Sequence, residues 1–216
     1  MNYKLVIFDF DGTLADTYPW FLSVFEDLAK RYRLPVLGKT DLEKLRALDF
    51  SQIQKKYKIP LWKVVLIGSY LKKLMSIQID KICLVSGMQT VIETLVEQNI
   101  KLAVVTSNAE KNVHRVLGPQ NTAFFDFIES GVPFFGKKNT FQKILKKTGI
   151  AAHETLSIGD EVRDLKSAHE AQISFGAVTW GYTDLAILQS HSPDEVFDHP
   201  NQILEAVNPF LSSLRH

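Results

Sequence analysis

Apolar residues along the chain follow two patterns: short unbroken runs, and longer repeats at helical spacing. The unbroken runs predict strands buried on both faces, over residues 5–8, 102–106, 125–129, 155–159 and 175–179. The repeats between them predict helices, over residues 91–96, 110–117, 139–148 and 164–171. Strands that alternate with helices in this way predict an α/β protein, in which helices cover both faces of a parallel sheet.

Residues 17–82 differ from the rest because they carry helical patterns and no strand signal of comparable strength. We expect helices there over residues 20–28, 41–48, 51–57 and 60–79. The last of these is apolar almost all round, which is typical of a buried helix. Such a helix could instead pack against a second copy of the chain, so the sequence leaves a monomer and a homodimer open.

Composition indicates an ordinary globular chain. It has 216 residues, of which 45% are hydrophobic and 23% charged, enough for one full core and a small second unit. The single cysteine, Cys83, excludes an internal disulfide and a cysteine-based zinc site, and we expect it to be a small core residue. Asp9 and Asp11 interrupt the N-terminal apolar run, and no segment has the length of a spanning helix. We therefore predict a cytoplasmic protein with no membrane partner.

Charge is unevenly distributed along the chain. The formal net charge of +1 gives no general attraction to nucleic acid, so we expect no such partner. Residues 17–82 carry 13 Lys or Arg against 6 Asp or Glu, whereas the remainder carries 12 against 18. The basic excess could attract anionic metabolites, or it could simply be a solvated surface. Arg46 is the first cation of this segment to test.

The first strand ends in two aspartates. Asp9 and Asp11 flank Phe10, and Gly12 marks where the strand stops. Two like charges so close raise each other's cost of ionisation unless a cation or a hydrogen-bond donor compensates them. The alternative is a purely structural role, in which the two aspartates only begin a turn or cap the next segment. If they face a site, they predict a divalent cation there, and carboxylate ligands with room for a phosphate suit Mg²⁺.

Polar residues also follow two other strands. Thr106, Ser107 and Asn108 come after the second strand, where hydroxyls and backbone N–H groups could hold an anion or could cap the next helix. Asp160 ends a later strand, and Asp164, four positions on, can face the same way or cap a helix. The carboxyl ends of parallel strands meet at one edge of the sheet, which predicts that these residues converge.

A lysine completes the set. Lys137 follows Gly136 ahead of a helix and could reach a phosphate as a point charge, although a solvated lysine is the ordinary reading. Lys138 is the alternative amine. We favour Lys137 because it follows the glycine directly.

Together these motifs resemble the haloacid dehalogenase superfamily, most closely its phosphoglycolate phosphatase-like branch. DFDGTLADT resembles the first motif, VVTSN the second, Lys137 the third and IGDEVRD the fourth. The resemblance implies a Rossmann-like parallel sheet core, formed by residues 1–16 and 83–216. It also implies an inserted all-helical cap, formed by residues 17–82. Many relatives carry Lys-Pro at the third motif, and this chain departs from that pattern.

The resemblance also implies a role for each site residue. Asp9 is expected to be the nucleophile that forms an aspartyl-phosphate, and Asp11 the general acid and base. Asp9 and Asp160 are expected to bind Mg²⁺ through their carboxylates, and Asp11 through its backbone carbonyl. The remaining expectations concern the phosphoryl group: Thr106, Ser107 and Lys137 bind its oxygens, and Asp164 orients Lys137 or a metal-bound water.

The function that follows is a Mg²⁺-dependent phosphatase acting on a small phosphorylated metabolite, such as phosphoglycolate or a sugar phosphate. A phosphomutase of the same fold uses similar residues and is an alternative. A non-catalytic phosphate-binding or signalling module is another, although the inserted helices and the Gly-Asp-x-x-x-Asp loop argue against it. Asp11 argues against dehalogenase chemistry, because it serves the leaving group of a phosphotransferase.

Overall fold

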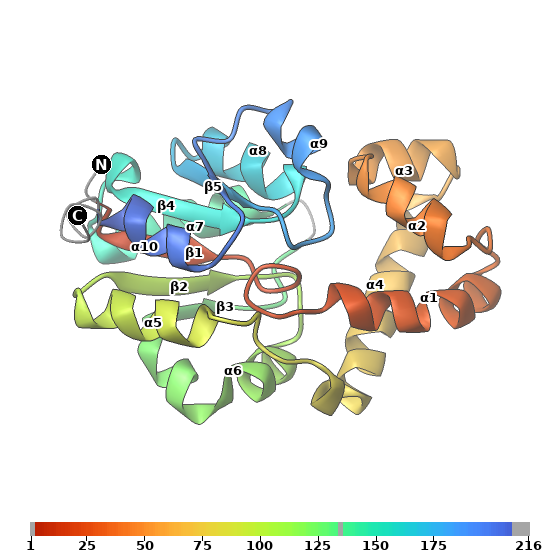
Figure 1. The fold of residues 1–216 in the computed structure, drawn as a ribbon, viewed down its shortest axis with the longest axis horizontal. Coiled ribbons are helices and arrows are strands. Elements are labelled where there is room, and N and C mark those ends of the chain that lie inside the picture. Colours follow the sequence, from red (N-terminus) through yellow and green to blue (C-terminus); the bar gives the residue numbers. More distant parts are fainter. Residues whose placement is uncertain (1–2, 134–135, 209–216) are drawn as a thin grey trace.

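Six parallel strands form one sheet in the computed structural model, which describes residues 3–133 and 136–208 (Figure 1). The strand order is β3-β2-β1-β4-β5-β6. The strands are β1 (Leu5–Phe8), β2 (Lys101–Val105), β3 (Phe127–Glu129), β4 (Thr155–Gly159), β5 (Ser174–Val178) and β6 (Glu195–Phe197). The predicted parallel α/β fold is therefore confirmed. The short strand β6, whose three residues carry no apolar run, was not predicted.

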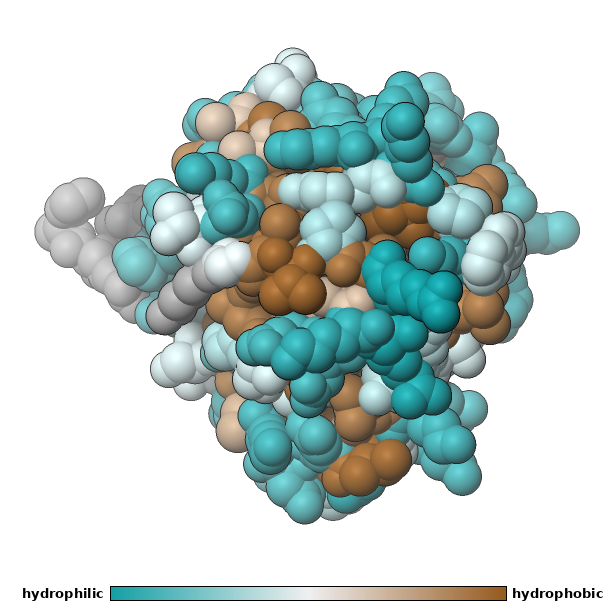
Figure 2. Space-filling view, turned by 90° about the vertical axis from the view of Figure 1, so that its right-hand side faces the viewer, coloured by the Kyte–Doolittle hydropathy of each residue, from teal (hydrophilic) through white to brown (hydrophobic). Residues whose placement is uncertain are grey.

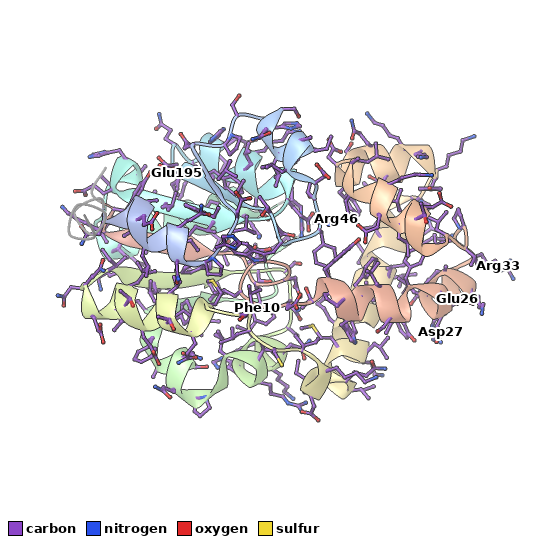
Figure 3. The ribbon with its side chains drawn as sticks, viewed as in Figure 1. Phe10, Glu26, Asp27, Arg33, Arg46 and Glu195 are labelled. Atoms are coloured by element: carbon purple, nitrogen blue, oxygen red, sulfur yellow. The ribbon has the colours of Figure 1, made fainter. Side chains whose placement is uncertain are left out.

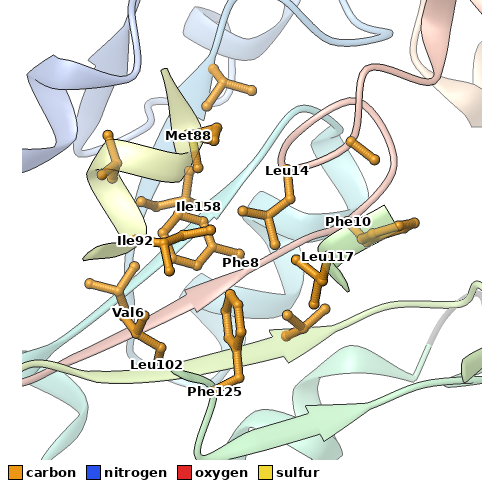
Figure 4. Close-up of a cluster of buried hydrophobic side chains, with 14 of the residues drawn as sticks. Val6, Phe8, Phe10, Leu14, Met88, Ile92, Leu102, Leu117, Phe125 and Ile158 are labelled. Atoms are coloured by element: carbon orange, nitrogen blue, oxygen red, sulfur yellow. The ribbon is translucent and has the colours of Figure 1, made fainter. Parts of the chain in front are cut away.

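Helices cover both faces of the sheet because successive side chains of each strand point to opposite faces. One face packs under α5 (Met88–Glu97), α6 (Glu110–Phe124) and α10 (Asn201–Val207), and Figure 4 shows part of this cluster, with Phe8 and Ile158 next to Ile92. The other face packs under α7 (Lys137–Thr148), α8 (Val162–Glu170) and α9 (Leu185–Gln189). Buried apolar side chains on both faces fix the strands and so fix where each strand ends.

Four helices lie beyond the carboxyl ends of the strands, on the right of Figure 1, and we call residues 18–77 the helical lobe. They are α1 (Tyr18–Tyr32), α2 (Lys39–Arg46), α3 (Phe50–Lys56) and α4 (Leu61–Ile77). The lobe has a small core of its own around Phe25, Ala29 and Leu42. Whether this lobe acts as a cap over a substrate stays a prediction.

Helix α4 is less buried than its apolar sequence predicts. Met75 is its one buried residue among those described, whereas Trp62 and Val65 are 63% and 69% exposed. Figure 2 views this side of the molecule and shows apolar side chains gathered between hydrophilic ones. The expectation of burial within one chain was wrong, because the lobe has too few other helices to surround α4. Packing against a second copy stays a prediction.

Two other expectations need correction. Cys83 is exposed, because it follows the buried Ile82 in an extended segment where successive side chains point in opposite directions. Its backbone carbonyl accepts a hydrogen bond from the Asp16 N–H at 2.9 Å. The helix expected over residues 110–117 continues to Phe124 past a non-helical Gly118. Of the helices in the described part of the chain, none is both long and apolar enough to cross a membrane.

Candidate active site

The central position of β1 brings three strand ends together. Its Phe8 pairs with Val104 of β2 on one side and with Ile158 of β4 on the other. Asp9 follows immediately, and its N–H donates to the carbonyl of Ile158 at 2.8 Å. Thr106 and Asp160, two residues beyond the paired positions, are therefore the neighbours of Asp9, as the strand-end pattern predicts. The convergence follows from sheet register, not from sequence proximity.

Asp9, Asp160 and Asp164 form a buried cluster of carboxylates. Each offers one oxygen, and these oxygens lie within 4.8 Å of one another. Asp164 joins the other two because α8 begins at Val162, so its first turn carries Asp164 back over the end of β4. All three side chains are at least nine-tenths buried. Carboxylates gathered at this distance in the dry interior repel one another, so a positive charge is needed among them.

Lys137 supplies one such charge. Its Nζ lies 2.5 Å from Oδ1 of Asp9 and 2.7 Å from Oδ1 of Asp164, and its side chain is only 4% exposed. Burial opposes its charge, but the two carboxylates outweigh burial and raise the pKa of Lys137, so it stays protonated. Lys138 instead lies 3.6 Å from Glu170 with 43% of its side chain exposed. Of the two lysines left open by the sequence, the structure brings Lys137 to the cluster.

One lysine does not neutralise the cluster. Burial raises the pKa of Asp9 to about 7 despite Lys137, and it raises the pKa of Asp160 well above its usual value. Burial also raises the pKa of Asp11 to about 6, although the amide of Asn108 acts in the opposite direction. Carboxyl groups with raised pKa values that gather in this way are typical of functional sites.

The donor set fits a hard divalent cation. Oδ1 of Asp160 accepts from the Thr13 hydroxyl at 3.1 Å, and its Oδ2 accepts from the Tyr182 N–H at 2.7 Å. Oδ2 of Asp164 is buried and accepts no hydrogen bond from any described residue. A cluster of oxygens with an unsatisfied carboxylate suits Mg²⁺ and offers neither the thiolate nor the imidazole ligands typical of zinc.

Two glycines leave room for Asp160. Gly12 adopts φ +75°, and a Cβ there would lie 2.5 Å from Oδ2 of Asp160. A Cβ at Gly181 would overlap the side chain of Asp160. Glycine is required at both positions because the backbone passes directly over the carboxylate.

Comparisons with known proteins identify the family of the chain. The family profile described as haloacid dehalogenase-like hydrolase matches residues 6–178. The chain belongs to this family. The phosphoglycolate phosphatase of Synechococcus elongatus is 24% identical over 209 residues, covering 96% of this chain and 99% of that protein. Pyrophosphatase PpaX of Bacillus cereus (strain B4264) is 26% identical over 232 residues, covering 99% of each.

A solved structure has the same fold. A crystal structure from Lactobacillus plantarum, named provisionally as a phosphoglycolate phosphatase, superposes with a TM-score of 0.78 at 24% identity. It covers 95% of this chain and 99% of its own. The predicted haloacid dehalogenase-like fold is thereby confirmed, including the helical lobe inserted after β1.

Asn108 is a site residue of this hydrolase that sequence reasoning did not single out. It is buried, and its Nδ2 donates to both carboxylate oxygens of Asp11 at 2.9 Å. Its N–H donates to the Thr106 hydroxyl at 3.0 Å, which locks the turn after β2. Asn108 was noted only as part of a polar strand end, because the contact with Asp11 spans 97 positions of sequence. Ser107, also predicted to bind substrate, is half-buried beside it.

Arg46 ties the helical lobe to the sheet, and Figure 3 labels it on the side of α2 that faces the sheet. Its Nη2 donates to the carbonyl of Gly181 at 2.9 Å, and its guanidinium lies over the Tyr18 ring, 5.0 Å from the centroid. Gly181 precedes Tyr182, whose N–H binds Asp160. The cation proposed for testing as a substrate contact is thus engaged by backbone carbonyls next to the carboxylate cluster.

We predict that the stability of the metal-free protein falls as pH rises, and that Asp9 causes part of this fall. The folded-state pKa of Asp9 is raised from 3.8 to about 7, so the folded state binds the proton more tightly than the unfolded chain. Its stabilising contribution is complete below the unfolded value and is lost as pH rises towards the folded value. In EDTA, the free energy of unfolding should therefore fall less steeply with pH in Asp9→Asn than in wild type, by up to about 1.4 kcal/mol per pH unit.

Chemical denaturation at several pH values measures this slope. Asp27→Asn, in an exposed part of α1, is the matched control and should keep the wild-type slope. Parallel curves for wild type and Asp9→Asn would contradict the assignment.

Arg46→Ala should loosen the loop that holds Asp160. Loss of a charged hydrogen bond costs about 1.5–3 kcal/mol, so we expect the Tyr182 amide to exchange hydrogen roughly tenfold faster. Hydrogen–deuterium exchange reports this directly. Arg31→Ala is the control, because its guanidinium stacks on Tyr70 within the lobe. Unchanged exchange at Tyr182 in Arg46→Ala would show that the loop is held by its other contacts.

Proposed function

We propose that the chain is a Mg²⁺-dependent phosphatase that hydrolyses a small phosphorylated metabolite through a phosphorylated Asp9. The observation that carries this proposal is the buried cluster of Asp9, Asp160 and Asp164 around Lys137. Membership of the haloacid dehalogenase-like hydrolases and the names of the two relatives support the reaction class. The proposal assigns the helical lobe, within residues 17–82, the role of a cap that closes over the substrate.

In the first step, a carboxylate oxygen of Asp9 attacks the phosphorus of a phosphate monoester. A bond forms between that oxygen and phosphorus, and the bond to the ester oxygen breaks. The leaving oxygen takes a proton from the carboxyl group of Asp11, so an alcohol departs. Lys137 and the hydroxyl and backbone groups of Thr106 and Ser107 bind the non-bridging oxygens, whose charge must be balanced throughout the transfer.

In the second step, water attacks the phosphorus of the phosphorylated Asp9. Asp11, now a carboxylate, accepts a proton from that water, and the bond between phosphorus and the Asp9 oxygen breaks. Inorganic phosphate leaves, and both aspartates return to their starting states. Burial raises the pKa of Asp11 to about 6, so its carboxyl can both release and accept a proton near neutral pH. The Asn108 amide holds that carboxyl in place through both steps.

Asp9 and Asp160 would bind Mg²⁺ through their carboxylates, together with the backbone carbonyl of Asp11. Asp164 is proposed to orient Lys137, which it contacts, and its unpaired Oδ2 is available to a metal-bound water. When bound, Mg²⁺ offsets the negative charge shared by the carboxylates and the phosphoryl group, which allows one anion to approach another.

Mg²⁺ should stabilise the wild-type protein against thermal unfolding, and Asp160→Asn should remove most of that effect. At a hundredfold excess over its Kd, a ligand specific to the folded state contributes about 2.7 kcal/mol. The measurement is the difference in Tm with and without Mg²⁺ near pH 7.5, which is above the pKa of about 7 for Asp9. Asp27→Asn should respond like wild type. An equal Mg²⁺ response in Asp160→Asn would remove that residue from the metal site.

The covalent route can be trapped with Asp11→Asn. An aryl phosphate such as 4-nitrophenyl phosphate leaves without help from an acid, but the water in the second step still needs a base. The variant should therefore accumulate a phosphoryl group on the peptide that contains Asp9, detectable by mass spectrometry after acid quench. Asp9→Asn should lose at least roughly a thousandfold in kcat and should accumulate nothing.

Two outcomes would count against the proposal. Equal phosphate release by Asp9→Asn and wild type would exclude the covalent route. Activity that requires a bisphosphate activator and returns the phosphoryl group to substrate would indicate the phosphomutase instead.

A further inference from the structure

A groove of about 440 Å³ lies between α4 of the helical lobe and the beginning of α6. Four of its lining residues follow α4 at intervals of three and four positions, so they form one face of that helix. The groove is lined by Ser69, Lys72, Lys73, Ser76, Asn108, Ala109, Lys111, Asn112 and Gly131. Its volume is within the range of sites that hold small metabolites.

The groove is strongly cationic. Its lining includes three lysines and no carboxylate. Lys72 donates to the carbonyl of Ser107 at 3.1 Å, which fixes its ammonium group over the turn after β2. Lys73 and Lys111 are exposed, and neither has an ion-pair or hydrogen-bond partner among the residues that the structure describes. Three uncompensated ammonium groups in one concave surface attract an anion more strongly than isolated surface lysines do.

Hydrogen bonds connect this groove to the proposed acid and base. Asn112 is fully buried, and its Nδ2 donates at 2.9 Å to both the carbonyl of Lys72 and Oδ1 of Asn108. Asn108 in turn donates to both oxygens of Asp11. One wall of the groove is therefore the residue that positions Asp11. The groove and the carboxyl group of Asp11 are therefore linked through one side chain, that of Asn108.

We propose that this groove binds a second anionic group of the substrate, on the side opposite the phosphoryl group that reacts. This inference rests on the proposed phosphatase function and narrows its substrate class to phosphate esters or anhydrides that carry a further carboxylate or phosphate. Lys73 and Lys111 are the specificity-determining residues. Lys72 is a positioning residue as well, since it also joins α4 to Ser107.

Paired substrates of similar size test the proposal. Ethyl phosphate has no second anion, phosphoglycolate adds a carboxylate, and pyrophosphate adds a phosphate. In the Lys73→Gln/Lys111→Gln double variant, kcat/KM for phosphoglycolate or pyrophosphate should fall roughly five- to twentyfold relative to ethyl phosphate. The change should appear mainly in KM and should weaken at high salt. Whichever of phosphoglycolate and pyrophosphate loses more kcat/KM in this variant identifies the anionic group, carboxylate or phosphate, that the groove binds.

Lys55→Gln/Lys56→Gln is the matched control, because it removes the same charge from exposed positions of α3 outside the groove. This variant should keep the wild-type ratio of kcat/KM between substrates with and without a second anionic group. Equal losses in the two double variants would mean that only the overall charge of the lobe matters, and would overturn the proposal.

Binding separates this inference from the proposed function. In the Asp9→Asn background, calorimetry with Mg²⁺ should give a higher affinity for phosphoglycolate or pyrophosphate than for ethyl phosphate, and the groove variant should abolish that preference. If wild type hydrolyses neither these three substrates nor other phosphate monoesters such as 4-nitrophenyl phosphate, the proposed function fails while this measurement still decides the groove. If wild type is active but Lys73→Gln/Lys111→Gln changes neither the kcat/KM ratio nor the affinity ratio between substrates with and without a second anion, only the inference about the groove fails.

Discussion

The burial of like charges at the end of β1 and β4 is the constraint on which the site depends. Asp9, Asp160 and Asp164 are held together by the sheet and by the first turn of α8, although each would be more stable in water. Folding energy from the two apolar layers maintains this arrangement. Lys137 compensates only part of it, as the raised pKa of Asp9 shows. The remaining imbalance supports the proposed binding of a cation and the proposed reaction between two anions.

The same constraint explains why neutral groups donate the hydrogen bonds to the carboxylate of Asp160. The Tyr182 N–H and the Thr13 hydroxyl satisfy its two oxygens without adding charge, and Gly12 allows the chain to pass close above it. The segment containing Tyr182 is also where Arg46 attaches the helical lobe. Displacement of the lobe would therefore be transmitted to a proposed metal ligand through a few hydrogen bonds, so lobe position and site geometry are coupled.

Local patterns were sufficient to predict five of the six strands and the strand ends that converge. Asp9, Thr106 and Asp160 could be located because each directly follows an apolar run, and parallel strands end at a common edge. The choice of Lys137 over Lys138 needed coordinates, since both lie in the first turn of α7 and only side-chain direction distinguishes them.

Other features depend on long-range contacts that no local pattern encodes. Asn108 meets Asp11 across 97 positions, and Arg46 meets Gly181 across 135. The exposure of Trp62 and Val65 was also beyond the sequence, because an apolar helix looks alike whether or not neighbours are available to cover it. The polar residues of α4, by contrast, can be located in the sequence. Ser69, Lys72, Lys73 and Ser76 recur at helical spacing, but the many apolar residues between them favoured the interpretation of a helix that is apolar almost all round.

The two ends of the lobe serve different purposes in this arrangement. At α2, the guanidinium of Arg46 donates hydrogen bonds to backbone carbonyls, so its charge contributes to structure and is poorly available to a ligand. At α4, Lys73 has no ion-pair partner among the described residues and lines the same groove as Lys111 of α6, so positive charge from the lobe and from a helix of the sheet layer meets there. An anion bound there would neutralise both ammonium groups and favour the closed approach of the lobe. Substrate charge would then contribute to closure as well as to recognition, because the cost of bringing like charges together is removed only when a suitable ligand is present.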